Sequence, residues 1–152
     1  MLNYCFVYRK DPNKDTVDAQ ASADSNIYAS GVPGTKVFQD NMLHTLQRRI
    51  IQLMELRRGK VPMPVEPPVL KDDQGLAYVT LGFSDSLKIL LWNEMIEQNI
   101  SSEELAKRLG IMDAQVDRLF QIGTLTGVML FERALNVLGK NLNLSLSNKE
   151  SQ

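Results

Sequence analysis

Four aspartates in the first 24 residues are the side chains best suited to metal chemistry. They are Asp11, Asp15, Asp18 and Asp24. Carboxylates gathered on a small sheet can ligate a divalent metal, but Asp11 and Asp15 flank the turn DPNKD, where aspartate usually forms the turn and stays solvated. With one histidine, His44, and one cysteine, Cys5, the chain has no Cys/His zinc site, Ser-His-Asp set or glycine-rich phosphate loop. We therefore expect neither an enzyme nor a metal or cofactor.

A second set of side chains, in SSEELAKRLGIMDAQVDRLF (101–120), could read DNA. Glutamine can form a bidentate pair with adenine, and arginine can pair with guanine or a phosphate. Gln115 and Arg118 are the residues expected to make these contacts. The candidate contact set on and beside the second helix is Lys107, Asp113, Ala114, Gln115, Arg118 and Gln121.

Acidic residues in the same region oppose DNA binding. Asp113 is expected to cap the second helix, which turns its carboxylate toward backbone amides, but Asp117 has no such role and repels phosphate. Residues 85–152 contain nine acidic and seven basic residues, and the whole chain has a net charge of −1. Binding would therefore need local clusters of charge and a dimer that engages two half-sites.

The apolar residues of 101–120 predict two short helices that cross closely. Ala106 is the small residue at the crossing, Gly110 opens the turn, and Val116 packs from the second helix, which is the spacing of a helix-turn-helix. Ser101 and Glu104 form a capping box at the start of the first helix. A small helical bundle without a DNA role is the alternative interpretation.

The elements that must position these residues follow from hydrophobic periodicity and turn signals. Strands are expected at 2–9, 16–22, 26–31 and 77–83, a helix at 36–58, an extended proline-rich connector at 60–69, helices at 85–99, 102–110, 114–122 and 124–140, a short amphipathic strand at 141–147, and a disordered tail at 148–152.

A basic set gathers near the end of the long helix. It consists of Arg48, Arg49, Arg57, Arg58 and Lys60. A solvated helix face with favourable charge at the helix C-terminus is the preferred interpretation. Contact with an acidic partner or with RNA is the alternative.

The composition indicates a packed globular protein rather than a disordered one, with 43% hydrophobic and 23% charged residues. A single cysteine cannot form an internal disulfide, no apolar run is long enough to span a bilayer, and the N-terminus has no signal-peptide pattern. A cytoplasmic protein without membrane contact is expected.

Residues 61–147 resemble the C-terminal half of HicB antitoxins of the helix-turn-helix type. The resemblance rests on VPMP, YVTLGFSDSLKILLWN, ISSEELAKRLG, DRLF and ALNVLGKNLNLSL. It implies a DNA-binding domain at 84–147 that ends in a short dimerisation strand. It also adds Ser102 to the DNA-contacting set, at a position where the family usually has glutamine.

The N-terminal half fits the same family through its order of elements. The resemblance implies an α+β protein in which a partial ribonuclease H-like β-β-β-α-β domain, 1–83, precedes the all-α domain. The family's aromatic-Pro-Asp-hydrophobic-Pro signature is absent, and within ADSNIYASG only Asp24 and Gly31 remain in its place.

The function implied is that of an antitoxin of a HicAB-like toxin–antitoxin system. The N-terminal domain would sequester a HicA-like toxin ribonuclease, and a homodimer or tetramer would bind operator DNA and repress its own operon. A stand-alone helix-turn-helix regulator, carried by a phage or mobile element and lacking a toxin partner, is the alternative.

Overall fold

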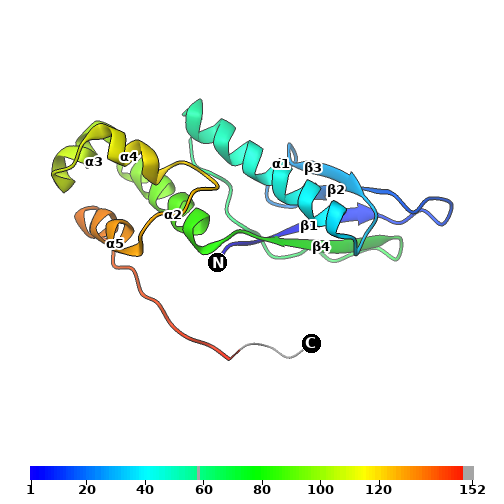
Figure 1. Ribbon diagram of the computed structural model, residues 1–152. Coiled ribbons are helices and arrows are strands. Elements are labelled where there is room, and N and C mark those ends of the chain that lie inside the picture. The colour runs from blue at the N-terminus through cyan, green and yellow to red at the C-terminus, as the bar shows by residue number, and fades with distance from the viewer. Residues whose placement is uncertain (58, 149–152) are drawn as a thin grey trace.

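The computed structural model describes residues 1–57 and 59–148. Within this part of the chain the fold is α+β, and Figure 1 shows a sheet with a long helix above it, followed by a group of shorter helices. The elements are β1 (Asn3–Arg9), β2 (Val17–Ala21), β3 (Tyr28–Gly31), α1 (Lys36–Glu55), β4 (Gln74–Thr80), α2 (Phe83–Gln98), α3 (Ser102–Leu109), α4 (Asp113–Leu119) and α5 (Val128–Val137). The predicted order of strands and helices is confirmed as far as α5.

The sheet is antiparallel, with strand order β3-β2-β1-β4, and α1 covers one of its faces. The helix buries one apolar stripe at three- and four-residue steps: Phe38, Met42, Leu46, Ile50 and Leu53. Strands β2 and β3 contribute the small residues Ala19, Ala21 and Ala29 to this core, and at Gly31 an added Cβ would lie only 2.6 Å from Phe38 Cδ1. Glycine there lets the first turn of α1 pack directly on β3.

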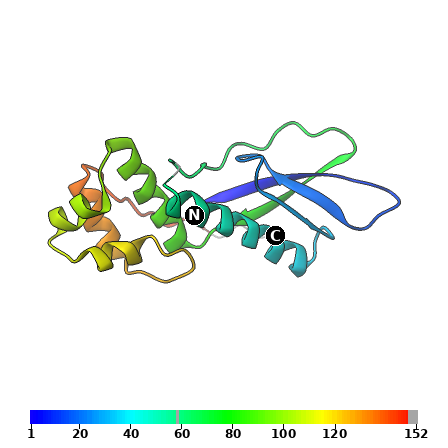
Figure 2. The same ribbon diagram turned by 90° about the horizontal axis from the view of Figure 1, so that it is seen from above.

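The helices α2 to α5 enclose a second hydrophobic core at one end of the sheet (Figure 2). Leu91 and Met95 of α2 pack there with buried residues of the three later helices. Ile89 and Trp92, also on α2, belong to the core between the sheet and α1. Because α2 has buried residues on more than one side, it can serve both cores.

The predicted proline-rich connector is extended and is fixed at its beginning. The Tyr4 hydroxyl donates a hydrogen bond to the Pro62 carbonyl oxygen at 2.7 Å, and burial raises the pKa of Tyr4 well above its ordinary value. The Asn93 amide of α2 bonds both backbone groups of Val61, at 2.7 and 2.9 Å. The connector therefore ties the sheet to α2.

The predicted strand at 77–83 is displaced toward the N-terminus. β4 pairs with β1 from Gln74, opposite Arg9, to Thr80, opposite Asn3, so its partner strand sets its bounds. Phe83 begins α2, and Gly82 precedes it as N-cap. Neither Ser84 nor Asp85 caps this helix, because both side chains bond the loop before α5.

The last two predicted elements also differ. The helix expected at 124–140 is confined to Val128–Val137, because Thr124 is engaged by Lys88 of α2. Residues 141–148 have no regular secondary structure in the single chain, since a strand needs a partner for its backbone hydrogen bonds. Leu144 and Leu146 are fully or largely exposed there. Of the predicted tail at 148–152, residues 149–152 lie outside the described part.

The ionised Asp24 side chain stabilises the folded N-terminal half to an extent that depends on pH. Its carboxylate accepts hydrogen bonds from the Asn26 amide at 2.9 Å and from Arg49 Nε at 3.0 Å. Burial alone would raise the pKa of Asp24, but these two partners outweigh it and hold that pKa below 3.8. The folded state therefore binds this proton more weakly than the unfolded state, and the stabilisation is lost as the pH falls through the folded pKa.

We predict that Asp24→Asn lowers the free energy of unfolding by about 1–2 kcal/mol at neutral pH, because it removes hydrogen bonds to a charged group. The difference from the unsubstituted protein should shrink below pH 3.8. Urea titrations at several pH values measure both quantities. Asp72→Asn, in an exposed turn, is the matched control, and an equal loss there would contradict the assignment.

Candidate nucleic-acid interface

The helices α3 and α4 meet at a short turn, as their spacing predicts. Ser101 caps α3, with its hydroxyl oxygen accepting from the Glu104 amide at 3.1 Å. Gly110 ends α3 with φ of 68°, in the left-handed region that glycine enters without strain. Ala106 and Val116 are buried. The crossing therefore rests on the residues that the sequence indicated.

The start of α4 differs from the prediction that Asp113 caps it. Met112 occupies the N-cap position, and Asp113 is the first helical residue, where its charge still suits the helix dipole. The side-chain oxygen of Gln115 accepts from the Met112 backbone amide at 3.0 Å. Gln115 thus has a structural task in this structure, and its availability for pairing with a base depends on giving up that bond.

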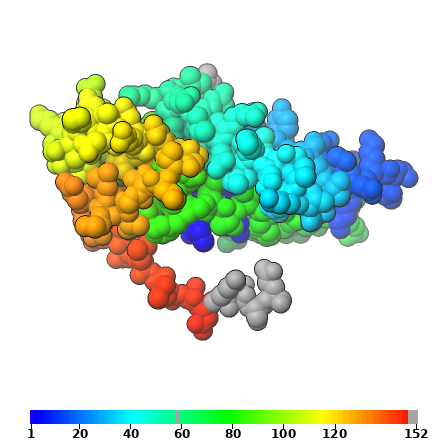
Figure 3. Space-filling model, viewed as in Figure 1, coloured from blue at the N-terminus to red at the C-terminus, as the bar shows by residue number. Residues whose placement is uncertain are grey.

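The predicted contact residues fall into three groups. Ser102 and Gln121 line a cleft between α1 and the pair α3–α4, together with Asp117. Gln115 and Arg118 line a smaller hollow beside the loop before α5, which Gln121 also borders. Lys107, Asp113 and Ala114 are exposed and line neither space. In Figure 3 the surfaces of α4, yellow, and α1, cyan to teal, lie side by side on one face of the molecule.

A buried lysine fixes the loop that follows α4. The side chain of Lys88 is fully buried, and its ammonium donates to the carbonyl oxygens of Gln121 and Thr124 and to Thr124 Oγ1, the last at 3.0 Å. Asp85 Oδ1 lies 3.8 Å from Lys88 Nζ and accepts from the Gly123 amide at 3.0 Å. Burial lowers the pKa of Lys88, and Asp85 partly offsets that effect.

The sequence contains a signal for this network, although neither Lys88 nor Asp85 was among the predicted site residues. Lys88 stands in the apolar run SLKILLW, one helical turn after Asp85. A charged residue inside such a run is buried unless it reaches solvent, and a buried charge needs polar partners. The partners themselves, backbone carbonyls more than 30 residues away, have no signature in side-chain type.

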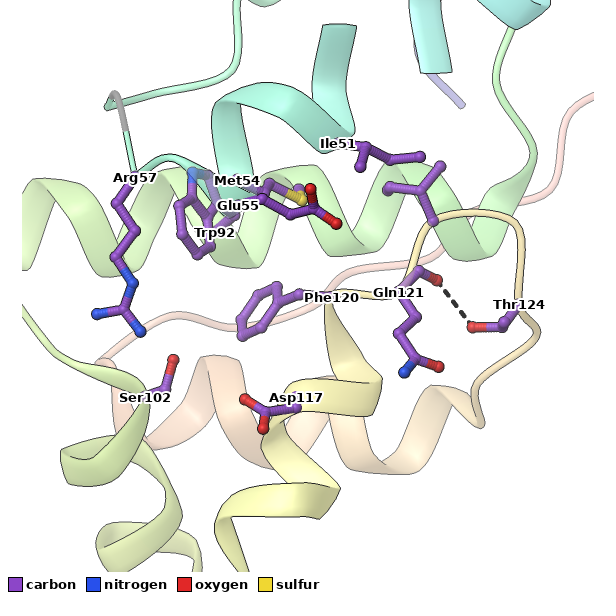
Figure 4. A pocket seen from close by; sticks show the side chains of 11 residues that line it. Ile51, Met54, Glu55, Arg57, Trp92, Ser102, Asp117, Phe120, Gln121 and Thr124 are labelled. Atoms are coloured by element: carbon purple, nitrogen blue, oxygen red, sulfur yellow. Dashed lines mark hydrogen bonds between the residues drawn. The ribbon is translucent and has the colours of Figure 1, made fainter. Parts of the chain in front are cut away.

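An aromatic contact supports the same region from the other side. The rings of Trp92 and Phe120 meet edge to face, with centroids 5.4 Å apart and an interplanar angle of 73°. Phe120 is the C-cap of α4, so the C-terminal end of the proposed recognition helix packs against α2. Both rings line the cleft that Figure 4 shows, where Phe120 lies between Trp92 and Asp117.

The described residues contain no cluster of three or more His, Cys, Asp or Glu side chains placed to hold a metal ion. In the same part of the chain, no helix combines the length and apolarity needed to cross a bilayer.

Comparisons with known proteins support the resemblance to HicB antitoxins. No family model matches the chain. It is 42% identical over 59 residues to Antitoxin HicB of Pseudomonas fluorescens (strain Pf0-1), which covers 39% of this chain and 40% of the relative. It is 32% identical over 87 residues to Antitoxin HicB 2 of Photorhabdus laumondii subsp. laumondii, covering 57% and 58%. Antitoxin HicB of Escherichia coli (strain K12) is 29% identical over 82 residues, covering 54% and 57%.

The chain thus spans about half the length of the curated relatives it matches. Over that span the resemblance to HicB-type antitoxins is confirmed.

We predict that Lys88→Met destabilises the protein by about 3 kcal/mol or more, because it removes the ammonium donor from the Gln121 and Thr124 carbonyl oxygens and the countercharge from the Asp85 carboxylate. Denaturant unfolding measures the loss. Lys107→Met, on an exposed helical position, should change the free energy of unfolding by less than about 0.5 kcal/mol. Equal effects of the two substitutions would show that the buried network does not hold the loop.

Proposed function

We propose that this protein is the antitoxin of a HicAB-like toxin–antitoxin system. Its N-terminal domain (1–83), a partial ribonuclease H-like fold, would sequester a HicA-like ribonuclease. Its helix-turn-helix domain (84–147) would bind operator DNA as a homodimer or tetramer and repress the operon. The observation that carries the proposal is the similarity to several proteins named Antitoxin HicB, together with an α3–α4 pair whose crossing is buried and whose Arg118 is exposed.

The face of the sheet opposite α1 is the proposed surface for the toxin. Cross-strand register places Val7, Gln20 and Tyr28 in one row with Leu76 on that face. Tyr28 is 67% exposed and Tyr78 is 45% exposed. Aromatic residues that remain exposed on a sheet face are typical of protein interfaces, and an antitoxin needs one for its toxin.

The exposed C-terminal residues support the proposed dimer. Leu142, Leu144 and Leu146 alternate with polar residues, which is the pattern of a strand with one buried face. In Figure 1 this segment leads away from α5 without an adjacent strand. Pairing with the same segment of a second copy would satisfy its backbone groups and cover the leucines.

A stand-alone regulator is the second candidate. The observation that favours it is the divergence of the N-terminal half from the family signature, in which only Asp24 and Gly31 remain. Both residues have structural roles here, in the ion pair with Arg49 and in the close contact with Phe38. Their retention is therefore consistent with either candidate.

We predict that the protein co-purifies with the small ribonuclease encoded beside its gene when the two are co-expressed. Tyr28→Lys should weaken this association at least tenfold, because it places a charge in the proposed interface. Val37→Lys, on the exposed side of α1 at 68% exposure, is the matched control. If the unsubstituted pair does not associate, the antitoxin proposal fails and the stand-alone regulator remains.

We predict that Arg118→Ala weakens binding to the DNA upstream of the gene by about 1–3 kcal/mol, the usual value for one bidentate base contact. Gln115→Ala is a less clean test because it also removes the bond to the Met112 amide. Arg9→Ala, at the far end of the sheet from α4, is the control for loss of charge. Fluorescence anisotropy with duplex DNA at fixed salt measures the three affinities. Unchanged binding by the Arg118 variant would exclude α4 as the recognition helix.

A further inference from the structure

The cleft between α1 and α3–α4 brings a cation of the N-terminal half beside the proposed DNA-binding face. Its volume is about 530 Å³, and its lining includes Ser102, Asp117 and Gln121 on one side and Glu55 and Arg57 on the other. Figure 4 shows the Arg57 side chain extending from the end of α1 toward the side of the cleft where Ser102 and Asp117 lie. Residues far apart in the sequence therefore line the same cleft.

The charges around this cleft make Arg57 its decisive residue. Glu55 and Asp117 are acidic, and Arg57 is the one cation among the described residues that line the cleft. Arg57 forms no ion pair with another described residue, whereas Arg49 is paired with Asp24, and Lys60 with Glu97. Of these three bases near the end of α1, Arg57 alone has its charge free for a partner outside the chain.

Arg57 has a strained backbone conformation, and the chain that follows it is fixed to α2. Its φ is 48°, in the left-handed region that a residue with a Cβ rarely adopts. Shortly afterwards, the Gly59 carbonyl oxygen accepts from Trp92 Nε1 at 3.1 Å, and Val61 is bonded on both sides by Asn93. Because Trp92 and Asn93 belong to α2, the chain just after α1 is fixed to α2, and Trp92 of the same helix contacts Phe120 at the end of α4.

We propose that Arg57 contacts the phosphate backbone of bound DNA, so that the N-terminal half contributes directly to operator binding. This inference rests on the proposed DNA-binding function. A DNA strand that passes Ser102 would cross the mouth of the cleft, where Asp117 repels it and Arg57 supplies the opposite charge. The positive charge of Arg57 would then offset the negative charge of Asp117, the residue of α4 that the sequence indicated as opposing DNA binding.

The test is the salt dependence of DNA binding. Each phosphate contact contributes about 0.9 to the slope of log affinity against log salt concentration. With a duplex carrying the DNA upstream of the gene, Arg57→Gln should reduce the slope by about that amount and weaken binding severalfold at physiological salt. Arg57→Lys keeps the charge and should retain the slope. Asp117→Asn should strengthen binding by both the unsubstituted protein and Arg57→Gln.

The control is Arg9→Gln, which removes the same charge at the far end of the sheet. Circular dichroism of each variant shows that it is folded, and Arg57→Gly, which relieves the left-handed backbone while removing the charge, should repeat the reduced slope. If Arg57→Gln and Arg57→Gly bind with the unsubstituted slope, the phosphate contact is excluded while the DNA-binding function stands. If the unsubstituted protein does not bind the duplex, that function and this inference both fail.

Discussion

The Lys88 ammonium can be buried only if oxygen atoms replace the water it loses, and the loop after α4 supplies them. Asp85, one turn earlier on the same helix, accepts from the amide of Gly123 in that loop. Between them the two side chains bind the backbone at Gln121, Gly123 and Thr124, so the path of the chain from α4 to α5 is determined by α2. The network therefore fixes the chain at the C-terminal end of α4.

Because α2 serves two cores, the two halves of the protein are mechanically connected. Trp92 packs with the core beneath α1 and with Phe120 at the end of α4. The same helix holds the connector through Asn93. A partner bound on the sheet and a nucleic acid bound on α4 would therefore act on one continuous framework, which is a physical basis for coupling toxin binding to repression in the proposed antitoxin.

The basic residues on α1 and just after its end have different electrostatic roles. Arg49 is used internally, where it lowers the pKa of Asp24, and Lys60 pairs with Glu97 across to α2. Arg57 is left with its charge toward the cleft. The preferred sequence interpretation, a solvated basic face, does not describe Arg49, which is paired internally, whereas Arg57 is exposed and Lys60 forms an exposed ion pair. Arg58 lies outside the described part of the chain.

The sequence alone determined the order of strands and helices, the apolar stripe of α1 and the roles of Ala106, Gly110 and Val116, because periodicity and glycine preferences are local. The bounds of β4 and α5, the cap of α4 and the partners of Lys88 were decided by tertiary structure, since each depends on atoms distant in sequence. The same is true of the cleft that joins Arg57 to Asp117. Side-chain types can identify residues able to bind DNA, but only packing decides which of them face a common surface.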